Sequence, residues 1–211
     1  LKVLDIGCGE GNLAAMLSFA GAVSVDGVDY SEEAINFANS RISLDNVKFI
    51  FSDYKAIKKK YDVVVMNGVL EHFDNPWEEL DFIRANLLKD NGYIVTTSPS
   101  FLNPRGYVWM TLQLLFDVPM SLTDLHFLCP FDFIEYCKKH DCSLGIESCD
   151  QDWGAGERTI IDFRKRLTNA LRDADLNNDK VEKFLSWLEK AMPFFNTDEN
   201  TGATVAYKIS C

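Results

Sequence analysis

The chain has 211 residues, which is long enough for one domain with a sizeable core. Its formal net charge is −11, and its basic residues form no cluster beyond residues 58–60. This balance argues against DNA, RNA or an anionic membrane surface as the main partner, because nucleic-acid binders carry a basic face. The sequence has no apolar run that could span a bilayer and no signal peptide, so we expect no membrane insertion.

The six cysteines include no C-x-x-C pair. We therefore expect reduced thiols in a cytoplasmic protein, and no metal. A zinc site built from Cys129, Cys137, Cys142 and a histidine lacks a recognisable spacing. The acidic run from Asp173 to Asp179 lacks the glycine and the glutamate that an EF-hand requires.

The first predicted elements are a short apolar strand and a helix joined by glycines. The strand Val3–Ile6 contains Asp5 and is followed by Gly7, Gly9 and Gly11, and the helix runs from Leu13 to Phe19. Glycines allow the backbone to turn sharply or to approach a ligand closely. The helix start adds free N–H groups and a partial positive charge. The pattern predicts a cradle for a nucleotide-like ligand at the end of a parallel strand.

A second strand is predicted over Ala22–Asp29, and Ser31 is a suitable N-cap for the next helix. An acid at the tip of this strand can accept hydrogen bonds from both hydroxyls of a ribose. Asp29 has this place, whereas the competing acid Asp26 lies inside the strand. Tyr30 could lie against an adenine ring or serve as a half-buried packing residue.

The third strand, Val47–Phe51, leads to Ser52, Asp53 and Tyr54. The valine-rich fourth segment from Tyr61 to Asn67 predicts a central strand that is buried on both faces. A helix is expected to open near Pro76 and to continue through Leu88. The turn over residues 87–92 then leads into a fifth strand.

Together these segments resemble the class I S-adenosylmethionine (SAM)-dependent methyltransferases. The form D-x-G-x-G-x-G from Asp5 to Gly11 resembles their motif I, and residues 69–72, V-L-E-H, resemble the ubiquinone-biosynthesis type. The turn at residues 87–92 resembles the family's L-k-p-G-G, with Asp90 and Asn91 in place of proline and the first glycine. The resemblance covers residues 1–99.

The resemblance implies a Rossmann-like α/β fold. It has a seven-stranded, mostly parallel sheet of order 3-2-1-4-5-7-6, with strand 7 antiparallel and helices on both faces. We expect one domain over residues 1–211, with a cofactor-binding half at 1–99 and a substrate-side half with inserted helices at 100–211. Helices that precede the first strand in many family members are expected to be missing from this sequence.

The resemblance also implies a cofactor site for SAM, with S-adenosylhomocysteine (SAH) as the product. Asp5 would orient the amino group of SAM, Asp29 would bind the ribose, and Asp53 would bind the adenine amino group; otherwise Asp53 is a turn cap. The full set of expected cofactor-binding residues is Asp5, Gly7, Cys8, Gly9, Gly11, Asp29, Tyr30, Ser52, Asp53, Tyr54 and Asn67.

The second half of the chain bears on the methyl acceptor. The apolar run Tyr107–Phe116 is either a helix packed on the core or a wall of the substrate pocket, and the second interpretation favours a partly apolar acceptor. Further elements are a helix at Phe131–His140, a strand at 142–149, a turn at 153–156, helices at Glu157–Asp173 and Asp179–Met192, and a final strand at Ala203–Ser210.

An oxygen acceptor must lose a proton, which favours a histidine as the base. His72 and His126 are the catalytic candidates, although His72 could instead pack beneath the cofactor. We therefore expect a methyltransferase that acts on O or N of a small molecule. The alternatives are a non-catalytic SAM-binding or interaction domain and, less favoured by the glycine spacing, an NAD-dependent oxidoreductase.

Overall fold

The computed structural model describes residues 1–119, 123–198 and 201–211. Contacts divide the chain into two compact units. The first unit comprises residues 1–98, 131–145 and 207–211, and the second comprises residues 99–130 and 146–206. Strands β6 and β7 begin in one unit and end in the other, and the last residue of β5, Pro99, also belongs to the second unit.

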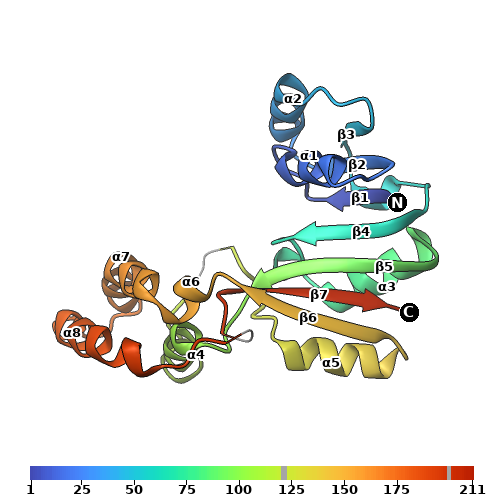
Figure 1. Ribbon diagram of the computed structural model, residues 1–211. Coiled ribbons are helices and arrows are strands. Elements are labelled where there is room, and N and C mark those ends of the chain that lie inside the picture. The colour runs from blue at the N-terminus through green and yellow to red at the C-terminus, as the bar shows by residue number, and fades with distance from the viewer. Residues whose placement is uncertain (120–122, 199–200) are drawn as a thin grey trace. The chain divides into compact units, whose positions relative to one another are not determined.

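A seven-stranded sheet organises the chain (Figure 1), and its order is β3-β2-β1-β4-β5-β7-β6. Strand β7 runs opposite to β5 (Figure 1), so the predicted topology is confirmed. The strands are β1 (Lys2–Ile6), β2 (Ser24–Asp29), β3 (Val47–Phe51), β4 (Tyr61–Asn67), β5 (Leu88–Pro99), β6 (Ser143–Cys149) and β7 (Thr204–Ser210).

Strand β4 is the middle strand of the sheet and pairs in parallel with both β1 and β5. Val63 and Val65 point toward the cluster that contains helices α1 (Asn12–Phe19) and α2 (Glu32–Arg41). Val64 and Met66 are fully buried on the opposite face. The unbroken apolar run therefore follows from burial on both faces, since side chains alternate along a strand.

The other helices of the first unit are α3 (Pro76–Asn86) and α5 (Pro130–Lys139), with short 3-10 segments at Tyr54–Ala56 and Leu70–His72. Ser31 caps α2, because its hydroxyl accepts a hydrogen bond from the backbone N–H of Ala34 at 3.2 Å. In α5, Phe133 stacks on Tyr207 of β7 at 3.7 Å between ring centroids, which holds this helix on the sheet.

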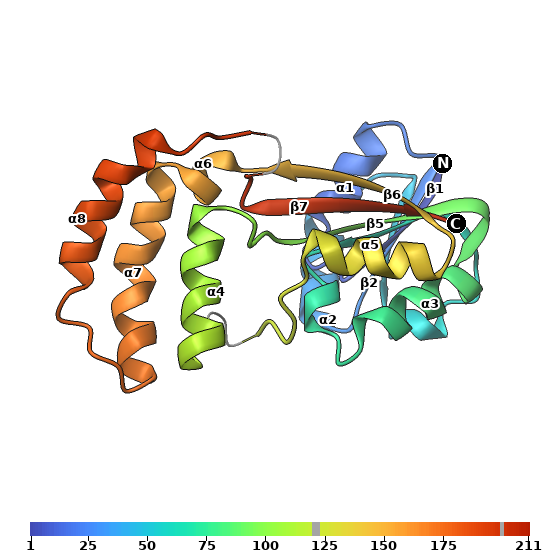
Figure 2. The ribbon, with the colours of Figure 1, turned by 90° about the horizontal axis from the view of Figure 1, so that it is seen from below.

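The second unit is mainly helical, and its longer helices lie side by side (Figure 2). It contains α4 (Pro104–Phe116), α6 (Gln151–Ala155), α7 (Glu157–Asp173), α8 (Val181–Ala191) and a 3-10 segment at Met192–Phe194. Trp109, Phe163 and Leu185 bring α4, α7 and α8 into one core. None of the helices in the described residues is long and apolar enough to cross a membrane.

The structure corrects several expectations. The helix expected to continue through Leu88 ends at Asn86, and residues 88–92, expected in a turn, lie in β5. Residues 153–156, predicted as a turn, lie in the short helix α6 and its end. Gly154 is needed there for tertiary contact: a Cβ at this position would lie 2.1 Å from the carbonyl oxygen of Thr201. Cys142 and Cys211, expected as reduced thiols, form a disulfide. Their pairing joins positions 69 residues apart, which spacing alone did not indicate.

Candidate cofactor-binding site

The loop after β1 is fastened to the neighbouring strand β2. The backbone N–H groups of Gly7 and Cys8 both donate to the carbonyl oxygen of Val28, at 2.8 and 3.1 Å. A single acceptor thus fixes two successive loop residues at the carboxyl ends of β1 and β2. This is the edge of a parallel sheet at which α/β proteins bind ligands.

Two of the loop glycines show why side chains are excluded. Gly11 has φ +80° and immediately precedes α1, and a Cβ on it would lie 2.3 Å from the ring of Phe49. Gly9 has φ +51°, and a Cβ on it would meet no heavy atom within 4 Å. The space beside Gly9 is therefore open to a ligand that approaches the backbone closely.

Asp29 connects the tip of β2 to this loop. One carboxylate oxygen accepts from the backbone N–H of Gly9 at 2.9 Å, and the other accepts from the backbone N–H of Ser31 at 2.8 Å. The carboxylate is thereby held in one orientation, with a second acceptor direction left on each oxygen. The competing acid Asp26 is engaged elsewhere, by the Tyr61 hydroxyl at 2.7 Å and the Lys59 amine at 2.6 Å.

Asp5 is a buried carboxylate, with 1% of its surface exposed. Its Oδ2 atom has no hydrogen-bond partner among the described residues. Burial, and secondly the nearby charge of Asp29, raise the pKa of Asp5 to about 7. An unpaired buried carboxylate is costly, so this position favours a cation or a hydrogen-bond donor supplied by a ligand.

Cys8 belongs to the loop, and the charges of both Asp5 and Asp29 act on its thiol. Burial, followed by the charges of Asp5 and Asp29, raises the pKa of the thiol to about 12. The side chain therefore stays a neutral thiol at physiological pH and behaves as a small apolar residue. It packs within the same cluster as α1 and β2.

The expected residues after β2 and β3 lie at the same sheet edge, because Asp29 pairs with Phe51 in the ladder. The backbone N–H of Ser52 donates to the carbonyl oxygen of Asp29 at 3.1 Å. Asp53 caps the following 3-10 segment by accepting from the backbone N–H of Lys55 at 2.8 Å. Tyr30 is 87% exposed, which leaves its ring accessible.

Tyr54 is packed inside the protein. Its ring contacts Phe73 and Phe82, and its hydroxyl donates to Glu79 of α3. Burial and then the Glu79 carboxylate raise the pKa of Tyr54 above its ordinary value, so the hydroxyl stays protonated. Tyr54 can therefore support the segment after β3, and its ring is largely covered.

Asn67 ends β4, one position beyond the pair Ile6–Met66, and therefore lies beside Gly7. Its side-chain oxygen accepts from the hydroxyl of Thr97 at 2.8 Å, and that hydroxyl also accepts from the backbone N–H of Gly68 at 3.1 Å. Thr97 was not among the expected site residues. Its position near the carboxyl end of β5 is the sequence signal that could have indicated this role.

The two candidate histidines belong to different units. His72 ends the 3-10 segment after β4 and is exposed, whereas the adjacent Glu71 is buried at 3%. His126 lies in the second unit, between α4 and α5. The structure thus brings His72, but not His126, into the same unit as the glycine loop.

Comparison with known proteins identifies the family. A family model described as a methyltransferase domain matches residues 1–142. The chain belongs to the methyltransferase domain family. The match includes the glycine loop, Asp29, Asp53 and Asn67.

Two curated relatives are ubiquinone biosynthesis O-methyltransferases. The protein from Neisseria meningitidis serogroup C is 29% identical over 153 residues, covering 65% of this chain and 62% of the relative. The protein from Pelagibacter ubique is 29% identical over 185 residues, covering 77% of this chain and 72% of the relative. The methyltransferase chain therefore spans between three fifths and three quarters of their lengths.

A solved structure supports the fold. A chain of the complex between the Haloferax volcanii Trm112 methyltransferase activator and a methyltransferase aligns with a TM-score of 0.63 at 16% identity. The alignment covers 99% of this chain and 81% of that chain. At this identity the similarity concerns the fold alone.

Proposed function

We propose that this methyltransferase domain transfers a methyl group from SAM to a hydroxyl oxygen of a small, partly apolar acceptor. Asp5 carries the proposal, since its buried, unpartnered carboxylate oxygen fits the ammonium group of the methionine part of SAM. The names of the two relatives, both ubiquinone biosynthesis O-methyltransferases, support oxygen as the acceptor atom.

The remaining site residues would hold the rest of the cofactor. Asp29 has acceptor capacity left for ribose hydroxyls, and the open space at Gly9 admits a close approach to the backbone. Tyr30 offers an exposed ring on which adenine can stack. Asp53 would add a contact to the adenine amino group, although its carboxylate also caps the next segment.

The bound cofactor supplies an electrophilic methyl group on a sulfonium. In the proposed reaction the acceptor oxygen forms the new C–O bond, the S–CH₃ bond breaks, and its electron pair stays on sulfur to give SAH. The site residues mainly orient the reactants, and orientation can contribute roughly 7–11 kcal/mol. The hydroxyl proton goes to a base, for which His72 and His126 are the candidates.

The first experiment is calorimetric titration with SAH of the wild type and two matched variants. Asp29→Asn removes the negative charge at the loop, whereas Asp45→Asn removes an exposed one elsewhere. We expect binding in the wild type, a loss of about tenfold or more in Asp29→Asn, and no change in Asp45→Asn. Equal affinities in all three proteins would contradict the proposed site.

The base is tested separately, with an acceptor found by screening phenols for SAH production. His72→Gln and His126→Gln are compared across pH. We expect one of them to lower kcat by roughly 10²-fold and to remove the acidic limb of its pH profile, with the KM for SAM unchanged. If both variants keep the wild-type profile, neither histidine is the base and the proton leaves directly to solvent.

A further inference from the structure

The carboxyl ends of β1, β4 and β5 bring three polar side chains onto one face of the sheet. These strands point the same way (Figure 1). Asp5 pairs with Val65, and Asn67 lies two residues further along β4. Asn67 pairs in turn with Thr97 of β5. Paired residues share a face of a parallel sheet, as do residues two apart on one strand. Asp5, Asn67 and Thr97 therefore lie on the face where Val65 packs with α1.

The side-chain amide of Asn67 is held in one orientation. Its Oδ1 atom accepts from the Thr97 hydroxyl at 2.8 Å. That hydroxyl accepts from the backbone N–H of Gly68 at 3.1 Å, so its own hydrogen is directed to Asn67. In the described part of the chain, no acceptor contacts the Nδ2 atom of Asn67, and the residue is exposed. The amide thus presents two N–H donors to a ligand.

The backbone donors of the glycine loop, in contrast, are largely engaged. Four of them donate to oxygens of the protein itself, namely the N–H groups of Gly7, Cys8, Gly9 and Gly11. The two acids of the loop region, Asp5 and Asp29, repel a further negative charge. An anionic group of a ligand at this edge of the sheet is therefore better served by a neutral donor from a neighbouring strand.

We propose that Asn67 binds the carboxylate of the methionine part of SAM, and that Thr97 is the positioning residue that orients the Asn67 amide. This rests on the proposed function, in which Asp5 receives the ammonium group. The ammonium and the carboxylate are attached to one carbon atom of the cofactor, so their partners must lie close together. Asp5 and Asn67 meet this condition on adjoining strands and one face. Without the Thr97 hydroxyl the amide is free to rotate and to turn its oxygen toward the carboxylate.

The test compares calorimetric titrations with SAH and with decarboxylated SAH, which keeps the ammonium and lacks the carboxylate. Thr97→Val removes the hydroxyl at nearly constant size, and the backbone N–H of Gly68 keeps the carbonyl oxygen of residue 97 as an acceptor at 3.2 Å. We expect the affinity for SAH to fall roughly three- to tenfold and that for decarboxylated SAH to stay unchanged. Thr97→Ser keeps the hydroxyl and should bind both ligands as the wild type does.

Thr96→Val is the matched control, since Thr96 is the next residue of β5 and lies buried on the opposite face. It should leave both affinities unchanged. A fall of equal size for both ligands in Thr97→Val would indicate a structural role alone and overturn the proposal. An unchanged affinity for SAH in Thr97→Val would overturn it as well.

Asn67→Asp should affect the two ligands differently. The new carboxylate repels that of SAH, whereas it attracts the ammonium of decarboxylated SAH. We expect the affinity for SAH to fall about tenfold or more and that for decarboxylated SAH not to fall. Unchanged binding of SAH would place its carboxylate at the N–H groups that begin α1 and overturn the proposal. If the wild type binds neither ligand, the proposed function itself fails, and this inference fails with it.

Discussion

At the scale of single residues, Asp5 combines burial with a charge that the proposed cofactor would neutralise. Its pKa of about 7 means that the carboxyl group is largely protonated in mildly acidic solution. The ammonium of SAM or SAH requires the ionised form. We therefore expect the affinity for SAH to rise between about pH 6 and pH 8, by at most tenfold per unit. Calorimetric titration with SAH across this pH range measures the affinity. An affinity that does not change with pH would exclude Asp5 as the partner of the ammonium group.

The same residue links binding to stability. A carboxyl group whose folded-state pKa is raised stabilises the fold below the unfolded pKa, and this stability is lost as pH rises through about 7. Asn at position 5 does not titrate. The wild type should therefore lose stability that the variant keeps. The free energy of unfolding of Asp5→Asn minus that of the wild type should increase by about 2–4 kcal/mol as the pH rises from about 4 to about 8.

Urea unfolding of both proteins without cofactor, at each pH, measures this difference. SAH titration of the same variant should show weakened binding, so that a gain in stability accompanies a loss of affinity. A stability difference that is independent of pH would mean that Asp5 is ionised throughout in the folded protein.

At the scale of elements, the parallel strands were predicted well because their signals are local. The observed bounds of β3 and β4 agree with those predicted from their apolar runs and flanking turn residues, and the same holds for the helix α7. The same local signals placed Asp29 at the tip of β2 and Asp53 just after β3. The engagement of Tyr54 by Glu79 and of Asn67 by Thr97 joins residues 25 and 30 positions apart, and no local pattern encodes such pairings.

The start of β5 is another element that sequence reasoning placed only in part. The ladder passes from Tyr61–Leu88 to Val63–Tyr93, so four residues of β5, at 89–92, oppose the single residue Asp62. Asn91 in this bulge has φ 63°, in the left-handed region. The family turn has glycine here, and the bulge explains why, since glycine reaches this region without a Cβ penalty.

Asn91→Gly should therefore stabilise the fold, by about 0.5–1 kcal/mol, because it relieves the left-handed conformation. Asn86→Gly is the matched control, since Asn86 lies at the end of α3 and glycine is unfavourable there by up to about 1 kcal/mol. Chemical denaturation of the two variants checks the opposite signs. Destabilisation by both would show that Asn91 makes contacts that outweigh its strain.

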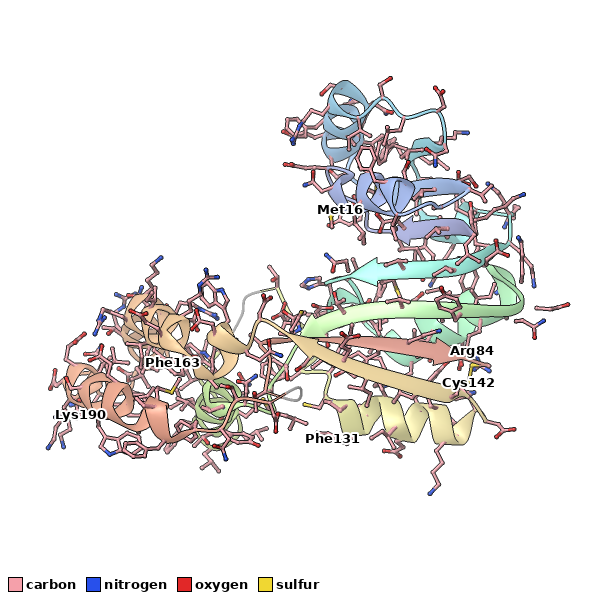
Figure 3. The ribbon with its side chains drawn as sticks, in the orientation of Figure 1. Met16, Arg84, Phe131, Cys142, Phe163 and Lys190 are labelled. Atoms are coloured by element: carbon pink, nitrogen blue, oxygen red, sulfur yellow. A yellow bond between two sulfur atoms is a disulfide. The ribbon has the colours of Figure 1, made fainter. Side chains whose placement is uncertain are left out.

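At the scale of the whole molecule, the disulfide is placed where it can act on a long segment. Cys142 precedes β6 and Cys211 follows β7, so the bond closes the chain around residues 146–206 of the second unit. Both cysteines belong to the first unit. Figure 3 labels Cys142 at this end of the sheet. The bond joins the ends of two strands whose other ends continue into the second unit.

A cross-link over 69 residues should stabilise the protein mainly by restricting the unfolded chain. The chain-entropy relation gives an upper value of about 4 kcal/mol. We expect Cys211→Ser, and reduction of the wild type with dithiothreitol, to lower the free energy of unfolding by similar amounts up to this value. Cys149→Ser, at an exposed free thiol, should change little. If reduction leaves the stability of the wild type unchanged while Cys211→Ser lowers it, the packing of the Cys211 side chain, and not the cross-link, stabilises the fold.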